Sequence, residues 1–372
     1  MPINISPAIS LMREDKKYFL IQFHDLENQI KKALCQNEGS EVLKLNFIKF
    51  GWFVLIYFFK FLFKNCNFKR IYCIFDLNNN KHFNDINNMK KNTIMLALLG
   101  IMLSLGTLQA QKLYTYPIGV QTYTFRKHFP VKGAEKTLDL IKELGFTEIE
   151  GGGVKEMSLE EYKKLCDARG ISIPSTGADF NELAKDPMSV VQRAKILGSK
   201  FVMCAWIPHK KGAFSLVDAQ KAIEVFNNAG KVLKENGITL CYHDHGFEFQ
   251  PFEDGTLLDY MIKNTNPQFV SFEMDVLWTI HGGGADMPVK LLRKYPGRFK
   301  LMHVKDLRKG VKGDLTGGTP AENDVAVGAG QGNWKQIIKL AKKGGVEHCF
   351  IEDESDKELE NIPLSIAYLK SL

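Results

Sequence analysis

From Tyr116 to the end of the chain, short apolar runs alternate with longer amphipathic stretches. Each short run is rich in β-branched and aromatic residues and leads into a turn, which is the pattern of a buried strand. There are eight such runs: YPIGVQTYT from Tyr116, FTEIEGG from Phe146, SIPSTGA from Ser172, FVMCAWI from Phe201, TLCYHDH from Thr239, VSFEMDV from Val270, FKLMHVKD from Phe299 and HCFIEDE from His348. The pattern therefore predicts eight strands.

The stretches between these runs have helical spacing. In AEKTLDLIKELG, Leu138, Ile141 and Leu144 mark one face and Gly145 ends the pattern; the longest stretch, VDAQKAIEVFNNAGKVLKENG, ends at Gly237 in the same way. Strands that alternate with helices pair in parallel, and eight such units predict a closed (β/α)8 TIM barrel. A doubly wound open sheet is the alternative, and it is disfavoured because no glycine-rich dinucleotide motif follows the first strand.

The stretch MKKNTIMLALLGIMLSLGTLQAQ, residues 89–111, has the layout of a secretory signal peptide. Two lysines follow the methionine, an uncharged apolar run comes next, and the small residue Ala110 precedes a polar stretch. A buried helix or a membrane anchor is the alternative. We expect a signal peptide over residues 89–110 and an exported, periplasmic barrel over residues 111–372, with no stable membrane association after cleavage.

Residues 1–88 are rich in Asn, Phe, Ile and Lys, and their apolar residues show no sustained helical or alternating period. We interpret them as a non-native extension upstream of a true start at Met89, disordered or poorly structured. The apolar run GWFVLIYFFKFLF, residues 51–63, is an alternative membrane segment. It is interrupted by Lys60 and is shorter than the roughly 20 residues that a membrane span needs.

Charge and cysteine spacing exclude several classes of function. The whole chain has a net charge of +7, but residues 111–372 hold 35 basic and 34 acidic side chains, so no affinity for nucleic acid or membrane surfaces is expected of them. The cysteines of this segment show no CxxC spacing. We therefore expect buried single thiols, rather than a zinc site or disulfides, at Cys166, Cys204, Cys241 and Cys349.

Polar residues stand where several of the predicted strands end. In TIM barrels the chemistry lies at the C-terminal ends of the strands. The candidates by this criterion are Glu150, His243, His245, Asp275, His303, Lys305 and Glu352. The last four strands each end in His, Asp or Glu, and His243, Asp275, His303 and Glu352 together form a mixed nitrogen and oxygen set suited to one Mn²⁺, Co²⁺, Zn²⁺ or Mg²⁺ ion. A purely structural polar network is the alternative.

The motifs YHDHGFEF, FEMDVLW, HVKD, VGAGQGNW and FIEDE follow one another at barrel spacing. In this the chain resembles the xylose-isomerase-like barrel superfamily of sugar phosphate isomerases/epimerases, tagatose-type epimerases, inosose dehydratase and relatives of apurinic endonuclease IV. The resemblance implies a divalent metal held by Glu, Asp, His and Glu from strands five to eight. Asp275, His303 and Glu352 match the last three positions, and His243 stands in place of the first glutamate.

This departure leaves two histidines on the fifth strand. A neutral imidazole binds metal or abstracts a proton near neutral pH, and spacing does not decide between His243 and His245. Both fall on one face of a strand. Glu248 is a candidate to orient His245, and Trp206, Trp278 and Trp334 are either sugar-stacking rings or ordinary core residues.

Two further residues have alternative interpretations. Glu150 precedes three glycines that would let a substrate approach the backbone, or it is a solvated strand end. Lys305 binds a substrate oxygen or pairs with Asp306. We assign His245, Glu352, Glu150 and Lys305 as the catalytic candidates.

Together these features predict a secreted, metal-dependent enzyme that acts on a carbohydrate. Removal of a proton next to the carbonyl of a sugar or 3-keto-glycoside would lead to isomerisation, epimerisation or β-elimination. Export favours free sugars and glycosides over phosphosugars. A non-catalytic sugar-binding barrel and an endonuclease IV-like nuclease are the alternatives, and an oligomer is compatible with the sequence.

Overall fold

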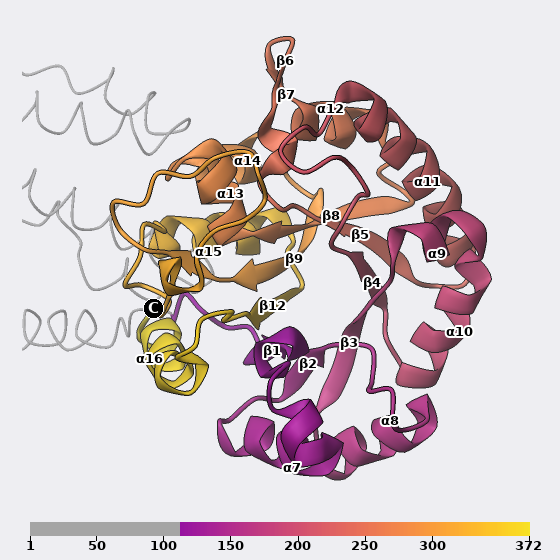
Figure 1. The fold of residues 1–372 in the computed structure, drawn as a ribbon, viewed down its shortest axis with the longest axis vertical. Helices are drawn as coiled ribbons and strands as arrows, with labels where there is room; N and C mark the ends of the chain where they lie inside the picture. The colour runs from indigo at the N-terminus through magenta and orange to yellow at the C-terminus, as the bar shows by residue number, and fades with distance from the viewer. Residues whose placement is uncertain (1–111) are drawn as a thin grey trace, which may run out of the picture. The chain divides into compact units, whose positions relative to one another are not determined.

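The structure is a computed structural model that describes residues 112–372. The predictions for residues 1–88 and for the signal peptide fall outside this part of the chain. Within it, the chain forms a closed barrel of parallel strands surrounded by helices (Figure 1). The predicted (β/α)8 TIM barrel is therefore confirmed.

Each predicted apolar run contains one barrel strand. Their bounds are β1 (Gly119–Gln121), β2 (Glu148–Glu150), β3 (Ser172–Gly177), β4 (Phe201–Cys204), β5 (Thr239–His243), β8 (Val270–Asp275), β9 (Phe299–Val304) and β12 (His348–Ile351). Neighbouring strands pair in the order β1-β12-β9-β8-β5-β4-β3-β2, and β1 closes the barrel by pairing with both β12 and β2. Because all strands are parallel, their C-terminal ends open at one rim.

Amphipathic helices connect the strands and cover the outside of the barrel (Figure 1). They are α7 (Phe129–Glu143), α8 (Leu159–Ala168), α9 (Phe180–Lys185), α10 (Pro187–Leu197), α11 (Leu216–Glu235), α12 (Leu257–Asn264), α13 (Val276–Gly283), α14 (Met287–Lys294), α15 (Trp334–Gly344) and α16 (Glu358–Ser371). The stretch predicted to end at Gly145 is α7, whose C-cap is Leu144. The longest predicted stretch is α11, with a capping box at its start. In the described part of the chain, no helix has the length and apolar character of a membrane span.

The loops contain short strands and single turns of 3-10 helix. A hairpin of β6 (Pro251–Phe252) and β7 (Gly255–Thr256) projects from the rest of the fold in Figure 1. A second pair, β10 (Asp306–Leu307) and β11 (Asp324–Val325), follows β9. Single turns of 3-10 helix lie at η2 (Thr122–Phe125), η3 (Phe247–Phe249) and η4 (Ala321–Asn323).

The barrel interior is apolar on one level and polar on the next. Phe201, Cys241, Leu301 and Phe350 form a buried cluster separate from the main core between strands and helices. Side chains two residues apart on a strand point to the same side. His243, His303 and Glu352 each stand two residues beyond a member of this cluster, so they lie above it toward the rim. The cluster closes the barrel beneath them.

The four cysteines of the described segment are free and buried, as the sequence predicted. The motif VGAGQGNW is also explained by the fold. The carboxylate of Asp306 accepts hydrogen bonds from the backbone N–H groups of Gly328, Gly330 and Gly332 and from the Trp334 indole, all between 2.8 and 3.1 Å. These contacts fasten the loop that precedes α15. Trp334 is thus a core residue, and Asp306 is a structural anchor.

Candidate metal and proton-transfer site

The strand-end residues singled out in the sequence meet at the C-terminal rim of the barrel. Glu150 and Asp275 end β2 and β8, His243 ends β5, and His303 lies one residue before the end of β9. Lys305 and Glu352 follow β9 and β12 directly, and His245 lies two residues beyond β5. A cavity of about 350 Å³, which we call the central cavity, is lined by Gln121, Met203, His243, His245, Glu352 and Glu354 among others.

Asp275 has one oxygen committed to the fold and one free. Its Oδ1 accepts a hydrogen bond from the backbone N–H of Trp278 at 2.9 Å and so caps the start of α13. Its Oδ2 is buried and has no hydrogen-bond partner. A buried carboxylate oxygen without a donor is costly unless a cation or a proton meets it. The free oxygen therefore marks a place where positive charge is needed.

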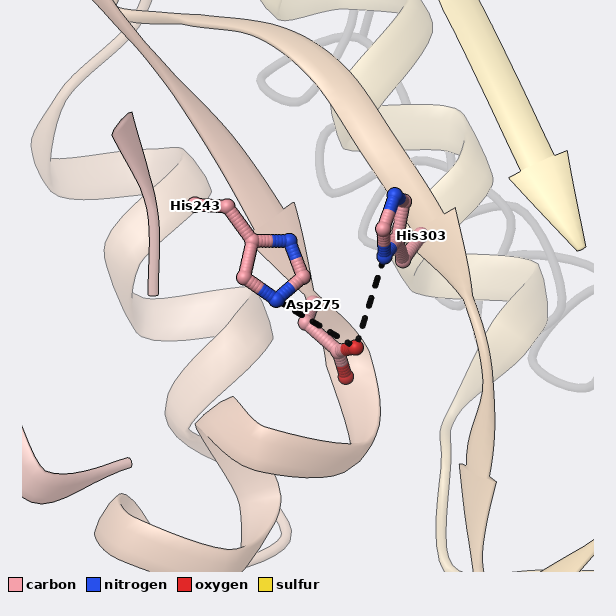
Figure 2. Close-up of side chains that lie close together, drawn as sticks. All are labelled: His243, Asp275 and His303. Carbon is pink, nitrogen blue, oxygen red and sulfur yellow. Dashed lines mark ion pairs between the residues drawn. The ribbon is translucent and has the colours of Figure 1, made fainter. Parts of the chain in front are cut away.

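Two histidines face this free oxygen. His243 Nε2 lies 3.9 Å and His303 Nδ1 lies 3.7 Å from Asp275 Oδ2. Dashed lines in Figure 2 mark these two ion pairs. These distances are too long for hydrogen bonds. Two donors about 2.1 Å from one ion at a tetrahedral angle lie about 3.4 Å apart, so the three atoms surround a space close to the size of a coordinated ion.

The opposite nitrogens of both histidines face deeper carboxylates. His303 Nε2 lies 2.7 Å from Glu150 Oε2, and it lies 3.4 Å from Glu273 Oε2. His243 Nδ1 also lies 3.4 Å from Glu273 Oε2. In metal sites the outer nitrogen of a ligating imidazole commonly donates its N–H to such a carboxylate, which turns the other nitrogen toward the ion. For His303, the hydrogen bond to Glu150 selects the tautomer that metal binding beside Asp275 requires, whereas His243 Nδ1 faces Glu273 without a hydrogen bond.

The same cluster offers a second possible arrangement. Glu150, Glu273 and His303 also bring one donor atom each within 4.8 Å of the others. Glu150 and Glu273 are fully buried, and Glu150 also accepts a hydrogen bond from the Gln121 amide at 2.7 Å. Of this second set only His303 lines the central cavity, whereas both His243 and His303 of the set around Asp275 do. The set around Asp275 therefore presents more donors to the cavity and is the better candidate for chemistry.

Electrostatics in the cluster follow from burial and from crowded carboxylates. Burial lowers the pKa of His243 well below its usual range, so its imidazole is neutral and able to act as a ligand. Burial also raises the pKa of Glu273, and the neighbouring Glu150 raises it further. For His303, burial lowers the pKa but Glu273 and Glu352 outweigh it, and the pKa is raised. Without an ion, the cluster compensates its excess carboxylates with protons.

Glu352 lies beside this group but also contacts a cation. Its Oε2 lies 3.4 Å from His303 Nδ1 and 2.9 Å from Lys305 Nζ. Burial raises the pKa of Glu352, but Lys305 and His303 outweigh it and hold the pKa well below its usual range. The predicted four-residue set is thus brought together, with His243, Asp275 and His303 as its compact part and Glu352 shared with Lys305.

Lys305 is buried behind the carboxylates that line the cavity. Its ammonium group bonds to Glu352 and Glu354 and lies 5.5 Å from the centre of the Trp278 ring. Only 1% of its surface is exposed, and it does not line the central cavity. The alternative expectation that it pairs with Asp306 is wrong, because Asp306 is used by the glycine loop. Lys305 instead fixes two carboxylates at the cavity wall.

His245 is held beside the metal candidates. Its ring stacks on Trp278, with centroids 5.0 Å and planes 21° apart, and its centroid lies 5.1 Å from that of His243. Burial and the charge of Lys305 lower the pKa of His245 to about 4. Its imidazole is therefore neutral at pH 7, and its Nδ1 is buried without a hydrogen-bond partner. A neutral imidazole carries a lone pair that can accept a proton.

Glu248 does not orient the His245 ring as expected. It accepts hydrogen bonds from the His245 backbone N–H at 3.0 and 3.1 Å and from the Tyr242 hydroxyl. It therefore fixes the main chain of the loop, and the Trp278 ring fixes the imidazole. Trp206 is 42% exposed and lies edge-on to His245, with ring centroids 5.4 Å apart. Trp206 is the one predicted tryptophan available to a ligand.

Three residues of the site were not identified from the sequence. Glu273 stands two residues before Asp275 in FEMD, Glu354 stands two residues after Glu352 in IEDE, and Gln121 ends β1. Two-residue alternation on a strand places Glu273 on the same side as Asp275, so the signal was present in the pattern. Glu354 follows the end of its strand, where this alternation no longer applies. Gln121 is uncharged, so a search for ionisable residues at strand ends does not select it.

Comparisons with known proteins agree with this architecture. The family model described as xylose isomerase-like TIM barrel matches residues 138–372. An inosose dehydratase from Clostridium botulinum (strain Alaska E43 / Type E3) is 24% identical over 270 residues, which cover 64% of this chain and 89% of the relative. A sugar phosphate isomerase/epimerase structure from Parabacteroides distasonis ATCC 8503 is 26% identical with a TM-score of 0.55, covering 69% of this chain and 94% of that one.

A further solved structure with this fold contains a divalent ion. It is a xylose isomerase-like TIM barrel protein from Mycobacterium smegmatis in complex with magnesium. It is 18% identical to this chain with a TM-score of 0.53, and the match covers 70% of this chain and 97% of that one. At this identity the likeness concerns the fold.

Proposed function

The chain belongs to the xylose isomerase-like TIM barrel family, and from this premise we propose that it is a divalent-metal-dependent enzyme acting on a sugar or keto-sugar derivative. The reaction begins with removal of a proton next to a carbonyl group and continues with β-elimination of a leaving group. A single observation carries this proposal. A neutral imidazole, that of His245, lines the same cavity as His243 and His303 of the His243–Asp275–His303 cluster, and its Nδ1 has no hydrogen-bond partner.

The donor set fits a divalent ion. His243, Asp275 and His303 would hold it, with Glu352 beside them, and two imidazoles with one or two carboxylates suit Mn²⁺, Co²⁺, Zn²⁺ or Mg²⁺. The magnesium in the Mycobacterium smegmatis structure supports a divalent metal ion as the class of ligand. A divalent ion bound there polarises the substrate carbonyl and stabilises the negative charge that develops on its oxygen.

His245 supplies the proton transfer in this scheme. Its neutral nitrogen takes the proton from the carbon next to the carbonyl, and the electron pair of that C–H bond becomes the new C=C bond. The C–O bond on the next carbon breaks, and its electron pair leaves with the oxygen. The imidazolium then returns the proton to that oxygen, and its low pKa makes it a strong acid for this purpose. Atoms and charge balance without any oxidant or reductant.

Elimination is favoured over its alternatives by the relatives and by the expected compartment. An inosose dehydratase, whose name implies loss of water, is among the relatives that match most of the barrel. Isomerisation and epimerisation share the first step and differ in where the proton returns. Export, if it occurs, favours glycosides and their 3-keto forms over phosphosugars. A glycoside oxidised at carbon 3 loses its aglycone by this elimination.

The direct test of the proposed reaction follows two events in one experiment, exchange of the proton next to the carbonyl and release of the leaving group. Purified protein is incubated with a divalent metal salt and methyl 3-keto-β-glucoside in D₂O, and the reaction is followed by ¹H NMR. The proposal expects release of methanol at a rate that depends on the metal. Return of intact substrate carrying deuterium would replace elimination by epimerisation or isomerisation. No exchange and no release with keto-glycosides or free ketoses would contradict proton abstraction.

Export is a separate proposal, supported by the sequence of residues 89–111. Mass spectrometry of the protein from its source cells is expected to find a mature N-terminus near Gln111. Peptides from residues 1–88 would contradict both the cleavage and the assignment of Met89 as the start.

A further inference from the structure

A second cavity adjoins the central one. It has a volume of about 400 Å³ and lies over the loops that follow β1 and β2; we call it the side cavity. Gln121, Tyr123 and Met203 line both cavities. The two cavities are therefore adjacent, and these three residues form the border between them. None of the catalytic or metal candidates lines the side cavity, so the mechanism leaves it unused.

One wall of the side cavity is flat and largely apolar. Tyr123 is 53% exposed, and the Arg126 guanidinium lies 4.8 Å from the centre of its ring. Arg126 donates one hydrogen bond each to the backbone oxygens of Tyr123 and Glu354, which hold its guanidinium group in place. Phe129 and Pro130 continue this wall. The aromatic and apolar surface of this wall suits a planar group.

A glycine loop forms another part of the lining. In the loop Gly151–Gly153, a Cβ on Gly151 would lie 2.4 Å from the Thr122 hydroxyl oxygen, and Gly153 has a positive φ of 90°. These two positions require glycine. A Cβ on Gly152 would meet only the Thr176 hydroxyl, at an ordinary 3.5 Å. At this loop the cavity is lined by backbone that carries no side chain.

We propose that the side cavity binds the aglycone of the substrate, and that this aglycone is a planar, aromatic group. The inference rests on the proposed function, because it takes the group expelled in the elimination as the occupant. The sugar ring stands in the central cavity beside His245, and the aglycone extends past Tyr123 into the side cavity. After the C–O bond breaks and the oxygen regains its proton, the side cavity holds the released alcohol.

Gly152 gives a test that leaves the central cavity untouched. Gly152 lines the side cavity, so the variant Gly152→Phe adds a ring at its wall, and Gly152→Ala is the matched control with the same loss of glycine but little bulk. Two substrates are compared, 2-phenylethyl and methyl 3-keto-β-glucoside. Both release simple alkanols of similar acidity, so leaving-group chemistry does not separate them. A 3-keto-disaccharide is the third substrate.

The expected result is a loss confined to the aromatic substrate. Gly152→Phe lowers kcat/KM for the 2-phenylethyl substrate at least tenfold, whereas the methyl substrate and the Gly152→Ala variant stay near wild-type values. Equal losses of kcat/KM for the methyl and 2-phenylethyl substrates would overturn the assignment of the side cavity as the aglycone site. A wild-type preference for the disaccharide over the 2-phenylethyl substrate would overturn the aromatic class.

Binding separates failure of this inference from failure of the proposed function. Saturation-transfer NMR with unoxidised 2-phenylethyl β-glucoside needs no catalysis and uses the wild-type protein. Saturation transfer from the wild-type protein to the phenyl protons, and weaker transfer from the Gly152→Phe variant, would support binding of the phenyl group in the side cavity. This holds even if no keto-glycoside reacts. Absence of transfer to the phenyl protons in the wild type contradicts the inference even if methyl 3-keto-glucoside is turned over.

Discussion

The ammonium nitrogen of Lys305 lies 2.9 Å from Oε2 of Glu352, and both side chains are buried. This contact decides how much of Glu352 is available to a metal ion. The same ammonium group bonds to Glu354, so one cation holds two carboxylates at the wall of the central cavity. Lys305 therefore acts as a positioning residue, through the carboxylates it binds and without lining the cavity itself.

Substitution of Lys305 is expected to lower activity without removing metal. In Lys305→Met the carboxylates of Glu352 and Glu354 lose their shared partner, and turnover falls on the order of 10² because the cavity wall is no longer fixed. Metal content stays at the wild-type level or rises, since a positive charge 4.0 Å from Asp275 Oδ2 has been removed. Turnover and elemental analysis are measured together. Lys300→Met is the control, because Lys300 lies at the other end of β9 and pairs with Glu347.

Asp275 allows its two roles to be separated. Asp275→Asn keeps an oxygen that accepts from the Trp278 N–H, so the cap on α13 survives while the charge facing the histidines is lost. We expect metal content to fall sharply with little change in the free energy of unfolding of the metal-free protein. Asp275→Ala also loses the cap, at a cost of about 1 kcal/mol. Elemental analysis and denaturant unfolding in EDTA measure the two effects, and an Asn variant that retains metal would contradict the assignment.

The ion pair of Glu182 and Arg193 predicts a pH-dependent contribution to stability. Arg193 donates to both carboxylate oxygens at 2.7 and 2.8 Å and also to the backbone oxygen of Gly177, which joins α9 and α10 to the end of β3. Hydrogen bonds from Arg193 lower the pKa of Glu182. A lowered carboxylate pKa gives stability that is fully present above the unfolded-state pKa and is lost as pH falls through the folded-state value.

Glu182→Gln should therefore lower the free energy of unfolding by about 1 kcal/mol at pH 7. The difference from wild type should begin to shrink as pH falls below about 4, the usual pKa of a glutamate, and should disappear below the lowered folded-state pKa. Urea unfolding at several pH values measures it. Glu143→Gln is the control, because Glu143 is exposed and pairs with no basic side chain in the described part of the chain. A deficit that persists unchanged at low pH would show that packing, and not the ion pair, is responsible.

The barrel followed from the sequence because its signal is repeated. Eight apolar runs separated by amphipathic helices leave few other arrangements, and each run contains a strand. The rim residues followed from the same reasoning, since a polar side chain at the end of a buried strand is unusual. Asp275 and His303, for example, end neighbouring strands and are opposite each other in register.

Hydrogen-bond partners could not be derived in the same way. The sequence predicts that Lys305 contacts a substrate or Asp306 and does not indicate Glu354, because only the path of the chain after β12 brings that carboxylate within reach. The sequence is compatible with Glu150 as a solvated strand end or as a catalytic group. The structure places it beneath His303, bonded to the ring and to Gln121. Such contacts depend on how strands are staggered around the barrel, which the pattern of one strand does not contain.

The division of labour between His243 and His245 is the central claim. Wild type, His243→Ala and His245→Ala are each incubated with a keto-glycoside in D₂O, and the loss of the proton next to the carbonyl is timed by NMR alongside metal analysis. His348→Ala is the control, because His348 starts β12 at the far end of the barrel and pairs with Glu148. We expect His243→Ala to lose metal, and His245→Ala to keep it while proton loss slows by on the order of 10² to 10⁴. Proton loss at the wild-type rate in a metal-loaded His245→Ala would contradict the account.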